Sequence, residues 1–263
     1  MPLWVLIQDE HSGLMKHLAA PVFEAFHGAK DDLQIGQPIA LLVQSPGGIG
    51  SASYQIARFL QRRCGEFTAV VAKEAWSAAT LLVLGASRLV MGSDACLGPL
   101  DAQLFDPDSE TLESALDEVQ ALERLHSHAL DYFDEFMMLL LERTGKRIGT
   151  LVPQAVEYAT GMMRPLLDQI DVVHYNERSR ILKVAEEYAR RLLEPRYGDE
   201  EARKIAARLV SAYPEHTFPI DIEEVRDMGL VVEEPTDEQC PLLEGLWPLM
   251  SGQTLVGQVK EMS

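Results

Sequence analysis

The sequence predicts an α/β domain, built on a mostly parallel sheet covered by helices, with a helical C-terminal half. Two observations support this. Up to residue 91, short apolar runs typical of buried strands alternate with segments whose apolar residues recur at helical spacing. Such β-α-β alternation is typical of a parallel sheet. From Thr111 onward the pattern changes to long amphipathic segments, which indicate helices.

The first half contains four expected strands and three expected helices. The strands are expected at Leu3–Ile7, Ile39–Gln44, Phe67–Ala72 and Arg88–Met91, and the helices at Leu14–His27, Ser51–Arg63 and Ala78–Ala86. In the second helix, Tyr54, Ala57 and Leu60 share one face, which is the spacing of a helix that packs on a core.

The second half is expected to contain four helices and a return to the sheet. The helices are expected at Leu116–Thr144, Leu151–Asp168, Ser179–Leu193 and Glu200–Ala212, followed by a small element at Asp221–Gly229 and a strand at Leu230–Glu233. We therefore expect residues 1–110 to form the α/β core. Residues 111–235 would be a helical extension and return element of the same domain, and residues 236–263 an irregular tail.

Composition limits the classes of partner. The chain has 263 residues, 47% of them hydrophobic, so it can bury a substantial core. The formal net charge of −18 argues against a nucleic-acid partner, because binding to the phosphate backbone needs a basic surface. It also disfavours anionic lipid surfaces. The plain reading of the acidic surface is solubility.

Cysteine usage and the lack of long apolar runs predict a cytoplasmic protein. The three cysteines, Cys64, Cys96 and Cys240, show no paired spacing and fit a reducing compartment. No stretch approaches the roughly 18 apolar residues of a membrane span, so we expect none. No group of residues has metal-ligand spacing, and no glycine-rich phosphate loop is present. We therefore expect neither a metal nor a cofactor.

Two small-residue turns carry the strongest functional signal. Ser45-Pro46-Gly47-Gly48 ends one strand, and Ser77-Ala78-Ala79 follows the next strand and opens a helix. Glycine lets backbone N–H groups approach a ligand closely, and a serine at a helix N-terminus lies beside unpaired N–H donors. The N–H groups of Gly47, Gly48 and Ala78 could form an oxyanion hole facing a nucleophilic Ser77. The plainer reading is that Ser77 only caps the helix.

Four segments together resemble a known family. They are Ser45–Gly48, Ser77–Leu81, Leu97–Gln103 and Tyr213–Asp221, and they occur in the order found in the serine dehydrogenase proteinase group of the Clp-protease/crotonase superfamily, which also includes signal peptide peptidase A. The resemblance covers roughly Leu3 to Val232. It implies a Clp-protease/crotonase-like ββα spiral, serine peptidase activity and assembly into homo-oligomers. It also implies Ser77 as the nucleophile, with Gly48 and Ala78 forming the oxyanion hole.

Two residues are candidates for the general base. His216 falls on a histidine position of the family motif, and histidine needs little pKa adjustment to act near neutral pH. Its competing role is a structural hydrogen bond in the turn. Lys73, four residues before Ser77, is the alternative base, although a solvated loop lysine is the reading we favour. Some relatives carry a lysine directly before the serine, where this chain has Trp76.

Asp101 lies in the family motif 24 residues after Ser77. It could orient His216 as a triad acid orients its histidine, or line the substrate cleft. It could equally be a turn aspartate that bonds its own loop backbone.

Three functions remain open at this level. The first is a serine peptidase that acts on peptides or unfolded proteins through an acyl-enzyme on Ser77. The second is an acyl-CoA-handling crotonase enzyme, although no basic patch for the CoA phosphates is found near the glycine turn. The third is a non-catalytic scaffold with the same fold.

Overall fold

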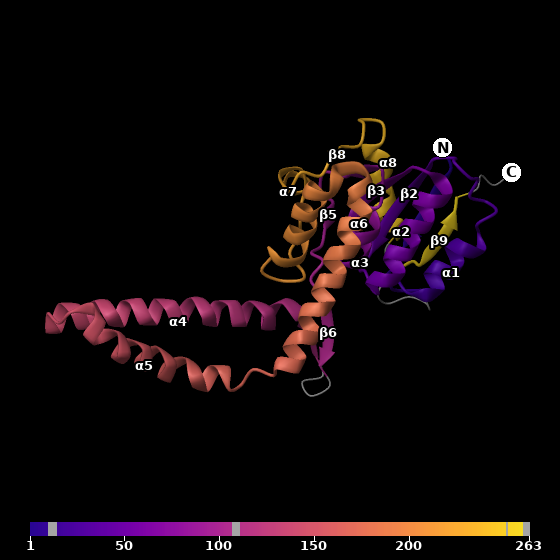
Figure 1. Cartoon of the computed structure of the whole chain (residues 1–263). Coiled ribbons are helices and arrows are strands. Elements are labelled where there is room, and N and C mark those ends of the chain that lie inside the picture. Colours follow the sequence, from indigo (N-terminus) through magenta and orange to yellow (C-terminus); the bar gives the residue numbers. More distant parts are fainter. Residues whose placement is uncertain (10–14, 107–110, 251, 260–263) are drawn as a thin grey trace. The chain divides into compact units, whose positions relative to one another are not determined.

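The computed structural model describes residues 1–9, 15–106, 111–250 and 252–259 (Figure 1). The chain divides into two compact units. Unit 1 contains residues 1–102 and 183–263, and unit 2 contains residues 103–182. The boundaries predicted near residues 110 and 235 differ from this division because the C-terminal part of the chain returns to the sheet of unit 1.

The core of unit 1 is a mostly parallel sheet, as predicted. Its described strands lie in the order β8–β4–β3–β2–β1–β9, and β5 also pairs with β3. Their bounds are β1 (Leu3–Ile7), β2 (Ile39–Ser45), β3 (Phe67–Ala75), β4 (Arg88–Met91), β5 (Cys96–Leu97), β8 (Val232–Glu233) and β9 (Leu255–Gln258). Strand β9 runs antiparallel to β1, and the other pairs are parallel.

Alternation along the strands separates two faces of this sheet. Side chains such as Trp4, Leu41 and Ala69 are fully buried, with no exposed area. Trp4 stacks on Phe26, with the ring centroids 5.9 Å apart. Phe26 belongs to α1 (Ala20–Gly28), which packs on α2 (Gly50–Cys64), and α2 in turn packs on α3 (Ala78–Leu84). These helices therefore cover one face of the sheet.

Part of the opposite face is covered by α8 (Cys240–Met250). Met250 packs in a cluster with Ile7, Leu42 and Ala72, and the Nε1–H of Trp247 donates to the carbonyl of Ala72 at 2.9 Å. The prediction of an irregular tail after residue 235 is therefore wrong, since this segment supplies α8 and the edge strand β9. Pro248 and the polar run before Cys240 hide the helical pattern in the sequence.

The first helix is shorter than predicted. We expected it to begin at residue 14, which lies outside the described residues, but α1 begins at Ala20. Pro21 explains this start, because proline lacks an N–H and is favoured in the first turn of a helix. Ala19 is extended, and Leu18 forms a parallel bridge with Gly48. Residues expected on a helix thus line the glycine turn.

Unit 2 contains a hairpin of strands and a hairpin of helices. Strands β6 (Gln103–Asp106) and β7 (Thr111–Ser114) pair antiparallel and were not predicted. Helices α4 (Ala115–Thr144) and α5 (Ile148–Leu167) pack on each other, with the rings of Phe136 and Tyr158 stacked 4.1 Å apart. Gly145 ends α4 in the left-handed conformation, as its position in the sequence predicts.

The third and fourth predicted helices form one element, α6 (Val172–Ser211). It is interrupted at Gly198, whose φ of 77° and ψ of 165° are not helical. The expected break is therefore a kink. The small element predicted at Asp221–Gly229 is α7 (Ile222–Asp227), which Asp221 caps by accepting a hydrogen bond from the N–H of Glu224.

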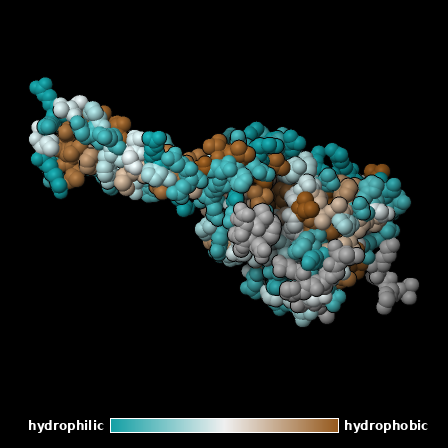
Figure 2. Space-filling view, turned by 90° about the horizontal axis from the view of Figure 1, so that it is seen from below, coloured by the Kyte–Doolittle hydropathy of each residue, from teal (hydrophilic) through white to brown (hydrophobic). Residues whose placement is uncertain are grey.

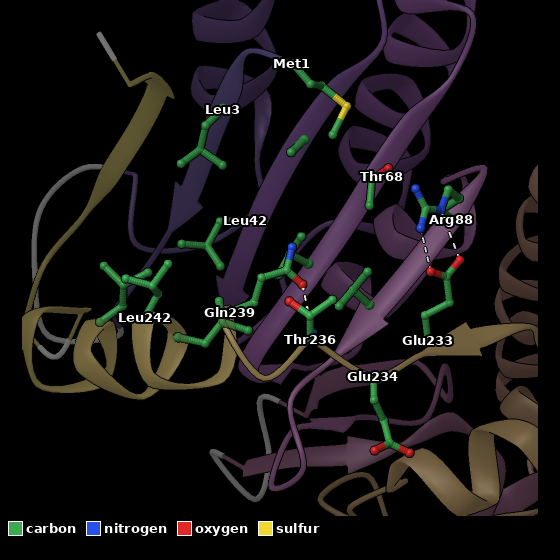
Figure 3. Close-up of a pocket in the computed structure, with 15 residues that line it drawn as sticks. Met1, Leu3, Leu42, Thr68, Arg88, Glu233, Glu234, Thr236, Gln239 and Leu242 are labelled. Carbon is green, nitrogen blue, oxygen red and sulfur yellow. Dashed lines mark hydrogen bonds and ion pairs between the residues drawn. The ribbon is translucent and has the colours of Figure 1, made fainter. Parts of the chain in front are cut away.

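The uncovered part of the second sheet face forms a cavity of about 390 Å³ (Figure 3). Leu3, Leu42 and Leu242 contribute apolar walls, and Arg88 and Glu233 form an ion pair at one side. None of the residues that the sequence predicts for the site lines this cavity. It is therefore separate from the candidate active site.

Candidate active site

Ser77 stands between β3 and α3 with an unusual backbone conformation. Its φ is 50° and its ψ is −114°, and it is the one non-glycine residue of positive φ in the described part of the chain. Such a conformation costs about 1–3 kcal/mol and is typical of functional sites. The side chain is partly exposed and makes no capping hydrogen bond with α3. The reading of Ser77 as a simple helix cap is therefore not supported.

The glycine turn lies directly against this serine turn. The N–H of Trp76 donates to the carbonyl of Ser45 at 3.0 Å, which joins the ends of β3 and β2. Gly47 has a φ of 97°, and a Cβ on it would lie 2.6 Å from the oxygen of Trp76 and 3.0 Å from the Cβ of Ser77. Position 47 therefore needs glycine both for its conformation and for this close approach.

The backbone donors around Ser77 differ in availability. The N–H of Gly47 donates to the Oγ of Ser45 at 3.0 Å, so it is already used. Within the described residues, the N–H groups of Gly48 and Ala78 meet no protein acceptor. Ala78 is the first residue of α3, where an N–H has no partner inside the helix. Of the three predicted oxyanion donors, Gly48 and Ala78 are the two that are open.

Asp101 and His216 form a direct pair. The Nδ1 of His216 lies 2.9 Å from the Oδ1 of Asp101, whose side chain is almost fully buried, while His216 remains partly exposed. When Asp101 is ionised and His216 is neutral, the carboxylate can only accept, so this contact puts the imidazole proton on Nδ1 and leaves Nε2 as an acceptor. This is the tautomer that a general base needs.

The loop that carries Asp101 packs on the serine turn. Gly98 lies so close that a Cβ on it would be 3.1 Å from the nitrogen of Ser77. In the same loop, Leu97 exchanges two backbone hydrogen bonds of 2.9 Å with Ile220, four residues after His216. The structure therefore brings Asp101 and His216 together and ties both of their segments to the loop beside Ser77.

Thr80 and Gln8 support this arrangement, and sequence reasoning missed both. The Oγ1 of Thr80, fully buried, accepts from the N–H of Gly98 at 3.1 Å and lies 2.8 Å from the Gly98 carbonyl and 2.7 Å from that of Ala75. Gln8 contacts Ser45 in the glycine turn. The signal for Gln8 was a polar residue at the end of an apolar run, and Thr80 lies inside the Ser77–Leu81 segment, but neither observation reveals a partner.

Lys73 lies elsewhere on β3. Its side chain is 47% exposed, and its Nζ is 3.5 Å from the Oε1 of neighbouring Glu74. This surface pairing agrees with the solvated-lysine reading. A lysine that acts as a base near neutral pH needs desolvated surroundings, and the Lys73 side chain is exposed.

Two further ionisable groups near these segments stay neutral at pH 7. Burial, with a contribution from Glu74, raises the pKa of Cys96 to about 11. Burial is also the main cause that raises the pKa of Tyr213 to about 12. Cys96 is therefore a protonated thiol and a poor nucleophile. This leaves the Ser77 hydroxyl as the candidate nucleophile beside the open N–H groups.

The described residues contain no group of three or more His, Cys, Asp or Glu side chains placed to hold a metal ion. In the part of the chain that the structure describes, no helix combines the length and apolar character needed to span a bilayer.

Comparison with protein families identifies the class of fold. The family model of ClpP-like SDH-type serine proteinases matches residues 21–134. Over this segment, which is less than half of the chain, the resemblance to the serine dehydrogenase proteinase family is confirmed. The matched segment contains Gly48, Ser77 and Asp101, and His216 lies beyond it. The predicted Clp-protease/crotonase-like α/β fold is confirmed with it.

Two uncharacterized proteins of Methanocaldococcus jannaschii, MJ0137 and MJ1495, are similar to this chain. They are 26% and 24% identical to it over 211 and 215 residues, which cover 80% and 82% of this chain. The chain spans 59% of the length of each of these relatives.

Among solved structures, the chain is similar to two variants of 1510-N, a membrane-bound stomatin-specific protease. The variant in complex with a substrate peptide has 14% sequence identity and a TM-score of 0.47, covering 86% of this chain and 74% of that chain. The second has 16% identity and a TM-score of 0.33, covering 55% of this chain and 71% of that chain.

Proposed function

We propose that this chain is a serine peptidase that hydrolyses peptide bonds through an acyl-enzyme on Ser77. The observation that carries the proposal is the pair of Asp101 and His216, joined at 2.9 Å and held by a loop that packs on the Ser77 turn. The open N–H groups of Gly48 and Ala78 support it further. The family match over residues 21–134 agrees with this class of enzyme.

In the first half of the reaction, the Oγ of Ser77 attacks the carbonyl carbon of the peptide bond. The Nε2 of His216 accepts the hydroxyl proton, and buried Asp101 stabilises the resulting imidazolium through Nδ1. The carbonyl oxygen becomes an oxyanion that accepts hydrogen bonds from Gly48 and Ala78. When the tetrahedral intermediate collapses, His216 returns the proton to the leaving amine and an ester on Ser77 remains.

The second half repeats this chemistry with water. His216 takes a proton from water as the water attacks the ester carbonyl, and the same N–H groups hold the new oxyanion. Collapse of this intermediate breaks the bond to Ser77, whose oxygen regains the proton from His216. The carboxylic acid product leaves, and the enzyme is restored.

A fluorophosphonate probe tests the nucleophile directly. We expect the probe to label the wild-type protein and to label Ser93→Ala, a variant of an exposed serine in a loop of the same unit, equally well. We expect Ser77→Ala to lose all labelling. Wild-type protein that stays unlabelled, or Ser77→Ala that is labelled like the wild type, would contradict the peptidase and favour the scaffold or crotonase reading.

The same assay separates the two candidate bases. We expect His216→Gln to slow labelling strongly, because the serine then has no group to take its proton. Lys73→Met should label like the wild type, since Lys73 is exposed and paired with Glu74. The reverse pattern would assign the base to Lys73.

We propose peptides or unfolded proteins as substrates and a homo-oligomer as the working form. The α4–α5 hairpin supports assembly, because large apolar side chains are exposed along it, and Figure 2 shows hydrophobic side chains at this part of the surface. They include Leu130, Met138, Ile148, Val156 and Met162. Sedimentation of the full chain at micromolar concentration tests this, and a monomer would contradict it.

A further inference from the structure

A closed ring of hydrogen bonds surrounds the glycine turn. The Oγ–H of Ser45 donates to the Oε1 of Gln8 at 2.6 Å, and the same Oγ accepts from the N–H of Gly47. The Nε2–H of Gln8 donates to the carbonyl of Met15. The backbone continues to Leu18, whose N–H donates to the carbonyl of Gly47 at 2.7 Å. Gln8 thus connects the turn with the segment 15–18.

This ring fixes the orientation of one peptide unit. The carbonyl of Gly47 and the N–H of Gly48 belong to the same planar trans peptide and point in opposite directions. Because Leu18 holds the carbonyl, the N–H of Gly48 must point away from Leu18. The N–H of Ile49 donates to the carbonyl of Leu18 at 2.7 Å, which fixes the other side of the turn.

Without the ring, little else would hold this peptide unit. Gly47 and Gly48 have φ values of 97° and 140°, and glycine has access to many other conformations. The Cα of Gly48 is packed so closely on Leu18 that a Cβ would lie 2.7 Å from the Leu18 nitrogen. The segment 15–18 therefore packs directly on the glycine turn and limits the conformations that the turn can adopt.

Gln8 lies between the segment 15–18 and the glycine turn and is hydrogen-bonded to both. Its side chain is 2% exposed, and its backbone N–H donates to the carbonyl of Gln44 at 2.9 Å, so it is fixed at the end of β1. A buried amide with both its oxygen and its nitrogen satisfied holds its neighbours rigidly, since breaking either bond leaves a buried polar group unpaired.

We propose that Gln8 is a positioning residue, which docks the segment 15–18 onto the glycine turn and thereby aims the N–H of Gly48 at the oxyanion of the reaction. This inference rests on the proposed peptidase function for its catalytic consequence. Gln8 touches no reacting atom and acts through Ser45, Met15 and Leu18. Undocking of the segment would release the peptide unit and disable one of the two oxyanion donors.

Gln8→Met tests the proposal, with Gln44→Met as the matched control. Both glutamines are buried and lie at the ends of neighbouring strands, but the Gln44 amide oxygen has no hydrogen-bond partner in the described part of the chain. We expect Gln8→Met to lower the protection of the Leu18 and Ile49 amides against hydrogen exchange at least tenfold. Gln44→Met should leave the protection of these two amides at the wild-type level. Unchanged protection in Gln8→Met would overturn the proposal.

Kinetics provide the second measurement. Loss of one oxyanion donor typically lowers kcat about 10²- to 10³-fold, and we expect Gln8→Met to lose activity toward this limit with little change in KM. Binding of a peptide aldehyde, which forms a tetrahedral adduct with an oxyanion, should weaken in parallel. A folded Gln8→Met with wild-type kcat would overturn the proposal.

A second variant, Ser45→Ala, tests the proposal if Gln8→Met does not fold. Ser45→Ala breaks the same ring at the Oγ between Gln8 and Gly47, and we expect the same loss of amide protection. If the wild-type protein shows no peptidase activity, the proposed function fails, and the exchange data alone decide whether Gln8 docks the segment. The two failures are therefore distinguishable.

Discussion

The Nδ1 of His216 lies 2.9 Å from the Oδ1 of Asp101, although the two residues are 115 positions apart in the sequence. Asp101 is almost fully buried, and His216 remains partly exposed. With the proton on Nδ1, the Nε2 of His216 is left as an acceptor. The contact also joins the proposed general base to a buried carboxylate.

Asp101→Asn should lower kcat by about 10³- to 10⁴-fold. An asparagine that keeps the contact can present its NH₂ group to Nδ1, which stabilises the wrong tautomer of His216 and moves the proton to Nε2. The measurement is peptide hydrolysis together with the rate of fluorophosphonate labelling. Asp94→Asn, at an exposed position, is the control. If Asp101→Asn keeps activity close to wild type, Asp101 does not orient His216 for catalysis, and its role is to stabilise its own turn.

Ser77→Gly should be more stable than Ser77→Ala, by about 1 kcal/mol. Both variants lack the hydroxyl, but only glycine adopts a φ of 50° and a ψ of −114° without strain. Relief of about 1–3 kcal/mol exceeds the roughly 0.5–1 kcal/mol of extra unfolded-state entropy that glycine brings. Urea denaturation measures the difference. A more stable alanine variant would show that the backbone at position 77 is not strained.

Thr80→Val should lower the free energy of unfolding by about 1–3 kcal/mol. Valine has nearly the same shape but leaves the buried N–H and carbonyl of Gly98 without the Thr80 hydroxyl. Thr144→Val is the matched control, because the Thr144 hydroxyl is exposed: it donates to the carbonyl of Leu140 and accepts from the N–H of Lys146. Thermal unfolding of the two variants gives the comparison, and equal melting temperatures would contradict the role of Thr80.

Alkylation of Cys96 should be slow at pH 8 and rise about tenfold with each pH unit up to its pKa of about 11. The raised pKa means that the thiol is protonated at pH 8, with about one molecule in a thousand ionised. Unfolding in urea returns the thiol to a pKa of about 8.5, so its reaction should accelerate by about two orders of magnitude. Mass spectrometry of the Cys96 peptide after iodoacetamide treatment follows both rates. Equal rates in the native and unfolded states would contradict this environment.

Local patterns in the sequence were sufficient for the central strands of the sheet and for the two turns, but not for β5 and β9. The apolar runs of β1, β2 and β4 have the predicted bounds within a residue, since short buried strands are set by composition alone. The start of α1 was misplaced because Leu18 has helical spacing to Val22 and Phe26. Its contact with Gly48, which makes it extended, is invisible along the chain.

The polar contacts of the candidate site were harder to predict from the sequence than the strands. Asp101 was predicted either to orient His216, to line the substrate cleft or to bond its own loop. The sequence could not decide between these roles, because the contact with His216 depends on the backbone bridge between Leu97 and Ile220. Gln8 carries no motif, and Thr80 lies inside the Ser77–Leu81 segment, but the roles of both come from partners that the fold brings near. The α8 helix was missed for a related reason, because its apolar residues are buried against a sheet face that only the folded chain brings to them.

The pairing of β1 with β9 joins the first strand of the described chain to its last. Trp4 lies opposite Gln258, so the edge of the sheet is completed only by residues more than 250 positions away. Contacts of such long range form late and slowly in folding. During synthesis, β1 leaves the ribosome long before its cover exists, and its open edge is a site where nascent chains can aggregate. We therefore expect a chaperone that shields this edge to raise the refolding yield.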